Sequence, residues 1–161
     1  MKKSLRILAA ALCVFAALTA LTACTGDKPA ENPGADMSVS EILDSVMSSV
    51  ELEINTVTTE LDAENFPYFA FIEQAEGMEG AVSEAMINAI AHSVVLVRVP
   101  DSEDPATVAQ QIKDNANPAK WVCVEAEKTE VVRNGNLVLL VMSDTATADA
   151  VVKSFNTFCG V

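Results

Sequence analysis

The sequence predicts an α+β fold: an antiparallel sheet of four to five strands with two helices on one face, plus an N-terminal helix. Three observations predict it. A β-β-α pattern occurs twice after residue 79, one strand in each copy is apolar at nearly every position, and an amphipathic helix precedes both copies. Strands that are apolar throughout are typical of a sheet centre covered on both faces. Layers of sheet and helix bury such strands.

Composition restricts the possible functions of the chain. Half of its 161 residues are apolar, which is too many for a chain that is disordered throughout. After residue 23 the chain has seven basic and 23 acidic residues, a net charge of −16. Such a surface repels phosphate backbones, so no nucleic-acid partner is expected.

Residues 1–23 are predicted to be a lipoprotein signal peptide. Three basic residues come first, an apolar run of 14 residues follows over 7–20, and the sequence Leu-Thr-Ala-Cys ends at Cys24. This ending matches the bacterial lipobox, in which the cysteine receives a diacylglyceryl thioether and becomes the new N-terminus. We therefore expect palmitate-type acyl chains on Cys24, which anchor the protein to the extracytoplasmic face of the cell membrane.

The alternative for this segment is a transmembrane helix over residues 7–23. Its 17 residues are at the lower limit of the spanning range, and no basic flank follows them. The signal peptide is therefore the favoured interpretation. Residues 24–37 are polar and rich in Pro and Gly, which predicts a flexible tether. A single α+β domain is then expected over 38–161.

The first element of the domain is a predicted helix over 38–50. Ser38 and Glu41 have the spacing of a capping box, in which each side chain bonds a free backbone N–H of the first turn. Apolar residues then recur at helical spacing from Val39 to Val50. This face is expected to pack on the core.

Residues 51–78 are harder to interpret. Alternating apolar and polar residues predict a short strand over 52–58, and residues 62–68 are typical of a turn or a one-turn helix because Pro67 disfavours helix at Phe66. Four aromatic residues lie close together here. They are expected to seal the edge of the core rather than to form an aromatic box: Phe66, Tyr68, Phe69 and Phe71.

The two β-β-α copies make up the remainder. The first has strands over 80–89 and 94–99 and a helix over 105–115; the second has strands over 128–133 and 137–142 and a helix over 145–157. Asn134-Gly135 is a strong hairpin signal. Because the two units have equivalent burial needs, both helices are expected side by side on one face, related by an approximate two-fold axis.

Several runs of the sequence resemble one known family. They are Ala85-Met-Ile-Asn-Ala-Ile-Ala-His-Ser-Val-Val-Leu-Val-Arg-Val99, Asn117-Pro-Ala-Lys-Trp-Val-Cys-Val124 and the strand from Gly135 to Ser143, together with the leader. In this order they resemble the small lipoproteins of Gram-positive bacteria grouped as domain of unknown function 4358. The resemblance covers about 75–160 and implies a lipid-anchored extracytoplasmic protein without an established activity, so it assigns no catalytic residues.

His92 and two cysteines are the candidates for reactive chemistry. Ser93 follows His92 in a strand, so the two side chains should point to opposite faces and cannot form a catalytic dyad. We expect His92 to bond locally near the start of its strand. Cys123 and Cys159 are expected as separate thiols, with Cys123 buried, because the helix between their positions holds them too far apart for a disulfide. One His and two distant Cys do not make a zinc site.

Asp101-Ser-Glu-Asp104 has alternating oxygen donors but lacks the Gly and the distal Glu of a calcium loop. Asp104 is expected to cap a helix that begins at Pro105. No metal and no cofactor is expected.

Trp121 could bind a sugar or peptide, or could cover the helix of the first unit. The candidate residues for a ligand or partner are Tyr68, Met86, Asn88 and Trp121.

Two functions remain open from sequence. The first is a non-catalytic binding module that holds a protein, peptide or wall component at the outer face of the membrane, and it is favoured because no catalytic constellation is recognisable. The alternative is a cell-envelope enzyme that uses carboxylates as acid and base. A carboxylate pair with a raised pKa would favour the enzyme, whereas an exposed apolar patch would favour the binding module.

Overall fold

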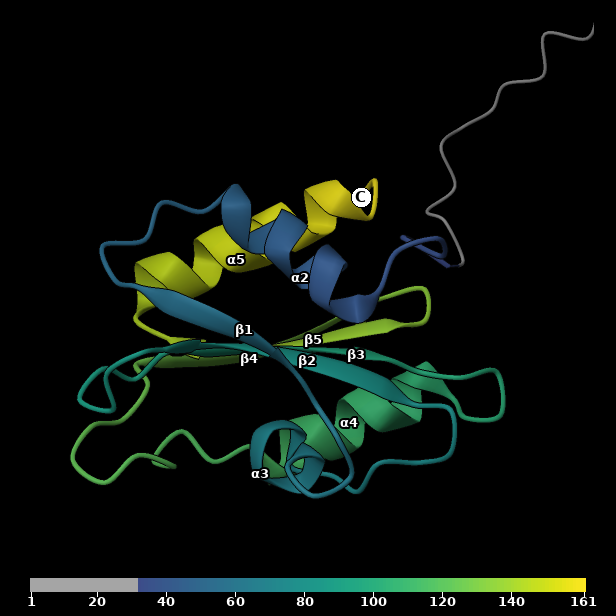
Figure 1. The fold of residues 1–161 in the computed structure, drawn as a ribbon, viewed down its shortest axis with the longest axis horizontal. Coiled ribbons are helices and arrows are strands. Elements are labelled where there is room, and N and C mark those ends of the chain that lie inside the picture. The colour runs from purple at the N-terminus through teal and green to yellow at the C-terminus, as the bar shows by residue number, and fades with distance from the viewer. Residues whose placement is uncertain (1–31) are drawn as a thin grey trace, which may run out of the picture.

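The computed structural model describes residues 32–161, in which one antiparallel sheet of five strands carries helices on both faces (Figure 1). The strand order is β1-β2-β3-β5-β4. In chain order the elements are α2 (Val39–Ser48), β1 (Thr56–Glu60), α3 (Phe66–Ala70), β2 (Glu79–Ala85), β3 (Ser93–Arg98), α4 (Pro105–Asn115), β4 (Lys128–Asn134), β5 (Leu137–Ser143) and α5 (Thr145–Phe158). The predicted α+β class and the five-stranded sheet are confirmed. The predicted signal peptide and Cys24 lie outside the described residues.

Helix α2 begins as the sequence predicts. Ser38 accepts a hydrogen bond from the Glu41 amide, and the Glu41 carboxylate accepts one from the Ser38 amide, so the capping box is complete. The predicted tether, however, is too long at its C-terminal end. Arg98 donates hydrogen bonds to the carbonyl oxygens of Gly34 (2.9 Å) and Met37 (2.7 Å), and Pro33 is buried. The folded domain therefore begins before residue 38.

The segment between α2 and β2 departs from the expected boundaries. The strand predicted over 52–58 begins four residues later and ends two residues later, as β1. Helix α3 includes Phe66, although Pro67 was expected to exclude it. The proline stands in the first turn, where its missing N–H would have no intrahelical partner, so it does not break the helix.

Two hairpins form the sheet as predicted, β2 with β3 and β4 with β5. In the second hairpin Asn134 pairs with Leu137, so the two turn residues are Gly135 and Asn136. Gly135 has a φ of 58°, a conformation that favours glycine and suits the first position of a two-residue hairpin turn. Strands β3 and β5 then pair antiparallel and bring the two hairpins together at the sheet centre.

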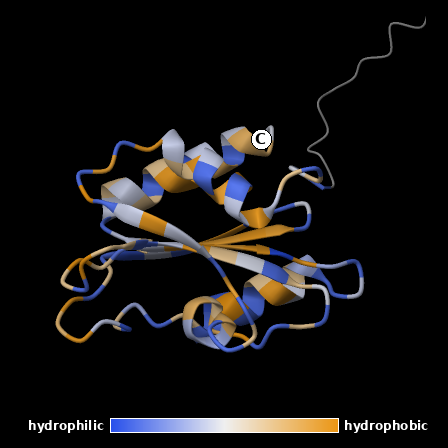
Figure 2. Cartoon of the chain, in the orientation of Figure 1, coloured by the Kyte–Doolittle hydropathy of each residue, from blue (hydrophilic) through white to orange (hydrophobic). Residues whose placement is uncertain are grey.

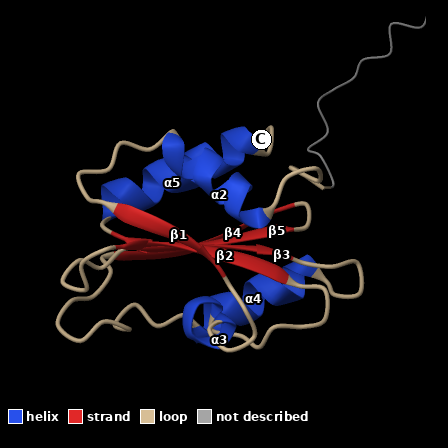
Figure 3. Cartoon of the chain, in the orientation of Figure 1, coloured by secondary structure: helices blue, strands red, loops and turns tan. Residues whose placement is uncertain are grey.

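The two faces of the sheet bury separate apolar clusters. Alternate residues of β3 and β5, such as Leu96 and Leu139, pack under α2 and α5, while their neighbours Val95 and Leu140 pack under α3 and α4. Figure 3 shows this three-layer arrangement, and Figure 2 shows the apolar strands at its centre.

The predicted placement of the two C-terminal helices is wrong. The helices expected over 105–115 and 145–157 are α4 and α5, and they lie on opposite faces of the sheet, so no two-fold axis relates the two β-β-α units. The reason is connectivity. Both β3 and β4 run antiparallel to β5 and hence parallel to each other, so α4 is a crossover helix with a strongly preferred hand. Helix α5 follows the last strand and covers the other face together with α2.

Candidate functional site

The structure brings Tyr68 and Trp121 together around a buried lysine. The Nζ atom of Lys120 lies 5.1 Å from the ring centroid of Tyr68, 4.8 Å from that of Phe69 and 5.2 Å from that of Trp121. These distances are in the range of cation–π contacts. Tyr68 and Phe69 therefore do form an aromatic box together with Trp121, contrary to expectation, and its occupant is a residue of the same chain. Phe66 and Phe71 pack on the core as expected.

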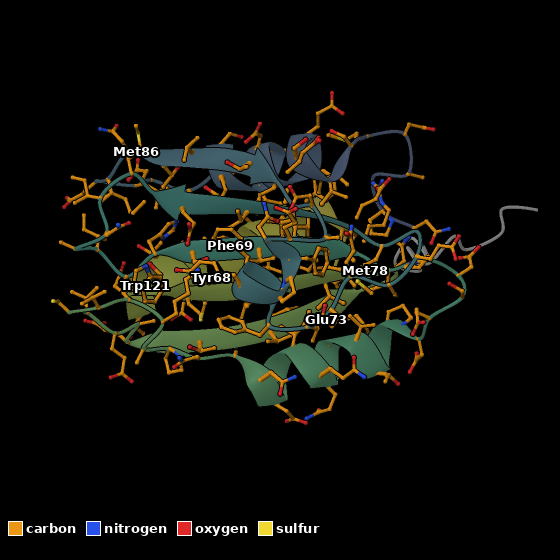
Figure 4. All side chains as sticks on the ribbon, turned by 60° about the horizontal axis from the view of Figure 1, so that its bottom comes forward. Tyr68, Phe69, Glu73, Met78, Met86 and Trp121 are labelled. Atoms are coloured by element: carbon orange, nitrogen blue, oxygen red, sulfur yellow. The ribbon has the colours of Figure 1, made fainter. Side chains whose placement is uncertain are left out.

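Two parts of the fold supply the walls of this box. Tyr68 and Phe69 are successive residues of α3, and their rings meet edge to face at 4.8 Å. Trp121 follows Lys120 in the loop over 116–127, which joins α4 to β4. Figure 4 shows Tyr68, Phe69 and Trp121 on the α3/α4 side of the sheet.

Polar partners on the sheet complete the site. Lys120 Nζ donates hydrogen bonds to Glu84 Oε1 at 2.8 Å and to Ser93 Oγ at 3.0 Å. Glu84 on β2 and Ser93 on β3 are paired residues, so the sheet register places both acceptors side by side. We call the five partners of Lys120 the lysine cage: Tyr68, Phe69, Glu84, Ser93 and Trp121.

The charge of Lys120 is shielded from solvent, since its side chain is 3% exposed. Burial lowers the pKa of its ammonium group, while the hydrogen bond and the charge of Glu84 act in the opposite direction. A buried charge is tolerated when it is paired and hydrogen-bonded, and Glu84 and Ser93 meet this need.

Exposed apolar side chains lie in the segments that carry the lysine cage and in the loop that joins Glu84 to Ser93. Val122 is 99% exposed, Met86 68%, Ile87 62% and Tyr68 56%, and Trp121 is partly exposed. They come from α3, from the loop over 86–92 and from the loop over 116–127, and Figure 4 places the labelled Met86, Tyr68 and Trp121 toward one end of the sheet. We call these five residues the tip surface: Tyr68, Met86, Ile87, Trp121 and Val122.

The four predicted binding residues thus share one end of the molecule. Tyr68 and Trp121 are neighbours in the lysine cage, whereas Met86 and the exposed Asn88 belong to the 86–92 loop. Trp121 packs on the apolar cluster of the α3/α4 face. The sequence reasoning missed Lys120 and Glu84. A basic residue directly before the one Trp of a strongly acidic chain was the available signal.

His92 belongs to a separate polar network on the opposite face, in which His92 and Ser143 are buried and Asp144 is exposed. It is 1% exposed, and its Nδ1 lies 3.0 Å from the hydroxyl of Ser143, which donates in turn to Asp144 at 3.3 Å. The backbone amide of His92 bonds locally, to the Ile90 carbonyl oxygen at 3.1 Å, but the partner of its side chain is 51 residues away, which the sequence did not predict. As predicted, Ser93 points to the other face, where it accepts from Lys120.

This network does not have the order of a catalytic triad. A triad places the histidine between the nucleophile and the acid, whereas here the hydroxyl of Ser143 lies between His92 and Asp144. The Nε2 atom of His92 is buried without a hydrogen-bond partner. Burial lowers the pKa of His92, and the charge of Asp144 opposes this shift. The arrangement keeps a neutral imidazole inside the core.

The two cysteines of the described region are free thiols, as expected. Cys123, however, is exposed rather than buried, because β4 begins only at Lys128 and leaves Cys123 in the preceding loop. Cys159 is buried beside α2 and α5, and burial raises the pKa of its thiol to about 11.

Three carboxylates have lowered pKa values, and all three sit at helix N-termini. Hydrogen bonds from Ser38 lower the pKa of Glu41, those from Thr107 and Ala106 lower that of Asp104, and those from Thr147 contribute most to lowering that of Asp144. The predicted cap of Asp104 on the helix at Pro105 is confirmed. A carboxyl group that acts as a general acid near neutral pH needs a raised pKa, whereas the pKa values of these three carboxylates are lowered.

A hollow lies at the other end of the sheet, beside the turn over 32–37. Its volume is about 410 Å³, and its lining includes Ser38, Glu60, Met78 and Arg98. The Arg98 guanidinium is already engaged by two backbone carbonyls and by Glu79.

Within residues 32–161, no group of three His, Cys, Asp or Glu side chains is placed to hold a metal ion. No helix in this region has the length and apolar character needed to span a bilayer. Comparison with family models, curated proteins and solved structures found no match to the chain.

Proposed function

We propose that the chain is a lipid-anchored binding module, which uses its tip surface to hold a protein or peptide partner at the extracytoplasmic face of the cell membrane. The observation that carries the proposal is the tip surface itself. Five exposed or partly exposed apolar side chains belong to three separate segments, and Figure 4 shows the labelled Tyr68, Met86 and Trp121 toward one end of the sheet. Exposed apolar patches of this kind are typical of interaction sites.

The placement of the two ends of the domain supports this proposal. Figure 1 shows the described chain beginning at one end of the sheet, with the 86–92 and 116–127 loops at the opposite end. A domain tethered through a lipidated Cys24 would therefore direct the tip surface away from the bilayer. The net charge of −16 after residue 23 favours a partner with basic groups.

The anchor is tested by changing Cys24→Ala in the full chain. We expect this variant to lose incorporation of a palmitate analogue and to be released or to accumulate as precursor, because the acyl acceptor is gone. Undiminished labelling of the variant would exclude lipidation at Cys24.

The tip surface is tested by site-specific photo-crosslinking in intact cells. A photoreactive residue at Val122 should give a discrete crosslinked product, and the same residue at the exposed Val161, at the other end of α5, should not. Trp121→Ala together with Met86→Ser should remove the product, because apolar contact area is lost. Equal products from both positions, or none from Val122, would contradict the proposal.

A further inference from the structure

The lysine cage consists of a fixed part and a loop part. Glu84 and Ser93 belong to paired strands, and Tyr68 and Phe69 belong to α3, which contacts β3. These four side chains are held by regular structure that does not depend on the 116–127 loop. They would keep their places if the loop moved.

The loop part is held by the Lys120 side chain and by the packing of Trp121 and Ala126 on the apolar cluster of the α3/α4 face. Residues 116–127 contain no helix or strand, and backbone hydrogen bonds close the loop on itself, as from Ala126 to Pro118 and from Lys120 to Asn117. Within the described structure, the hydrogen bonds that tie residues 119–125 to the sheet come from the Lys120 side chain, to Glu84 and Ser93. Movement of the loop therefore requires exchange of these two hydrogen bonds and separation of Trp121 and Ala126 from the apolar cluster.

The fixed part offers a place for a cation when Lys120 is absent. Without Lys120, the Glu84 carboxylate would lose the opposite charge that it pairs with in the described structure. Its side chain is 27% exposed, so the carboxylate would keep part of its hydration while it remained open to another cation. Aromatic faces and an anionic acceptor together are the features by which proteins bind organic cations.

We propose that the pocket of Tyr68, Phe69, Glu84 and Ser93 is an ammonium-binding site which Lys120 fills in the free protein, and that a lysine side chain of the partner replaces Lys120 there. This inference rests on the proposed function, because it assigns a ligand to the same end of the molecule. Exchange of one lysine for another releases the 116–127 loop and with it Trp121 and Val122.

The two hydrogen-bond acceptors decide which cation fits. Glu84 Oε1 and Ser93 Oγ lie at 2.8 and 3.0 Å from the nitrogen, so a bound group must donate N–H bonds to both. A primary ammonium has three donors, whereas a quaternary ammonium has none. The site therefore selects a lysine side chain over a trimethylammonium group, in agreement with the acidic surface of the domain.

Occupation by Lys120 also sets the apparent affinity. A ligand that can bind only when Lys120 has left is weakened by the fraction of molecules with an open pocket. If that fraction is about a tenth or less, removal of Lys120 should strengthen ligand binding by about tenfold or more.

The test uses the full chain purified in detergent, with n-propylammonium as the probe because it reproduces the end of a lysine side chain. Binding is followed through the fluorescence of Trp121, the one Trp of the sequence. We expect Lys120→Ala to bind the probe at least about tenfold more tightly than the unchanged protein, and to bind tetramethylammonium less well. Lys113→Ala, on the exposed side of α4, is the matched control and should behave as the unchanged protein.

Glu84→Gln added to Lys120→Ala should abolish the gain. A folded Lys120→Ala protein that binds n-propylammonium no better than the control, or that prefers tetramethylammonium, overturns the proposal.

If Lys120→Ala does not fold, the proposal is tested by hydrogen exchange of the unchanged protein. The peptide Gly-Lys-Gly at saturation should speed exchange at residues 119–125, whereas the same peptide with norleucine should not. Equal exchange with both peptides overturns the proposal as well.

The two proposals fail separately. Crosslinks from Val122 without ammonium binding by Lys120→Ala would leave the binding module standing and remove the ammonium site. Ammonium binding by Lys120→Ala without crosslinks from Val122 would leave the ammonium site standing and remove the binding module.

Discussion

The two faces of the sheet are built from the same strands but are covered differently. Helices α2 and α5, of 10 and 14 residues, close one face, whereas the other has the five-residue α3, the 11-residue α4 and irregular loops. Two consecutive residues illustrate the result. His92 points to the first face, where it bonds Ser143, and Ser93 points to the second, where it accepts from Lys120. Both side chains are buried, and the alternation of side chains along the strand decides which partner each one meets.

The largest effect expected from this comparison concerns the apolar strand β5. Leu139 is fully buried under α2 and α5, so Leu139→Ala should lower the free energy of unfolding by roughly 2–5 kcal/mol through lost burial and a residual cavity. Leu140→Ala is the matched change on the α3/α4 face. Its cost should be no larger, because loops can collapse into a cavity more readily than packed helices. Urea unfolding measures both; a loss under about 1 kcal/mol for Leu139→Ala would mean that the core is not where the structure puts it.

The buried imidazole of His92 predicts that the stability of the fold depends on pH. The pKa of His92 is lowered from its ordinary value of 6.5 in the folded state, so the unfolded chain takes up this proton first as the pH falls. The free energy of unfolding should therefore decrease below about pH 6.5, by at most about 1.4 kcal/mol per pH unit, until the folded-state pKa is reached. His92→Gln should remove this slope between roughly pH 5.5 and 7, a window above the ordinary titration of carboxylates. An unchanged slope in the variant would show that His92 is not the group responsible.

An aspartate caps the first turn of α4 on one face of the sheet, and another caps the first turn of α5 on the other face. The expected effects of removing them are smaller. Asp104 accepts from the amides of Ala106 and Thr107 at the start of α4, and Asp144 accepts from the amide of Thr147 at the start of α5. Replacing either by Ala should cost about 1 kcal/mol. Hydrogen exchange should show fraying over α4 in Asp104→Ala. In Asp144→Ala, which also removes an acceptor of Ser143, exchange should rise at the end of β5 too. Equal protection of α4 in Asp104→Ala and the unchanged protein would contradict the cap.

The smallest expected effect is a difference in chemical reactivity between the two thiols. Cys123 is exposed in the 116–127 loop, whereas Cys159 is buried on the α2/α5 face with its thiol pKa raised to about 11. Because the thiolate is the reactive form, iodoacetamide at mildly alkaline pH should modify Cys123 in the folded protein and Cys159 only after denaturation. Peptide mass spectrometry reports both sites in one sample. Rapid modification of Cys159 without denaturant would show that the closed face opens.

Local sequence was a good guide wherever one segment decides its own structure. The capping box at Ser38, the cap at Asp104, the hairpin at Gly135 and the buried strand around Leu139 each depend on residues close together in the chain. The start of strand β1 was misplaced by four residues, because its position depends on pairing with β2 and not on its own alternation.

Local sequence predicted only some of the residues of the candidate site. Tyr68, Met86, Asn88 and Trp121 were named as binding residues, and all four lie at one end of the sheet. Lys120 and Glu84 were not named, because a lysine and a glutamate 36 residues apart carry no mark of being paired. Their meeting depends on the register of β2 and on the path of the 116–127 loop.

By itself, the sequence determined the α+β class, the capped N-terminal helix, the two hairpins and the acidic character of the chain, because periodicity, caps and turn residues act over a few positions. The tertiary structure alone decided that α4 and α5 lie on opposite faces, that His92 bonds Ser143 and that Lys120 enters an aromatic cage. Each of these depends on which strands become neighbours. Neighbouring strands are chosen by chain connectivity and by burial of both sheet faces, which no single segment encodes.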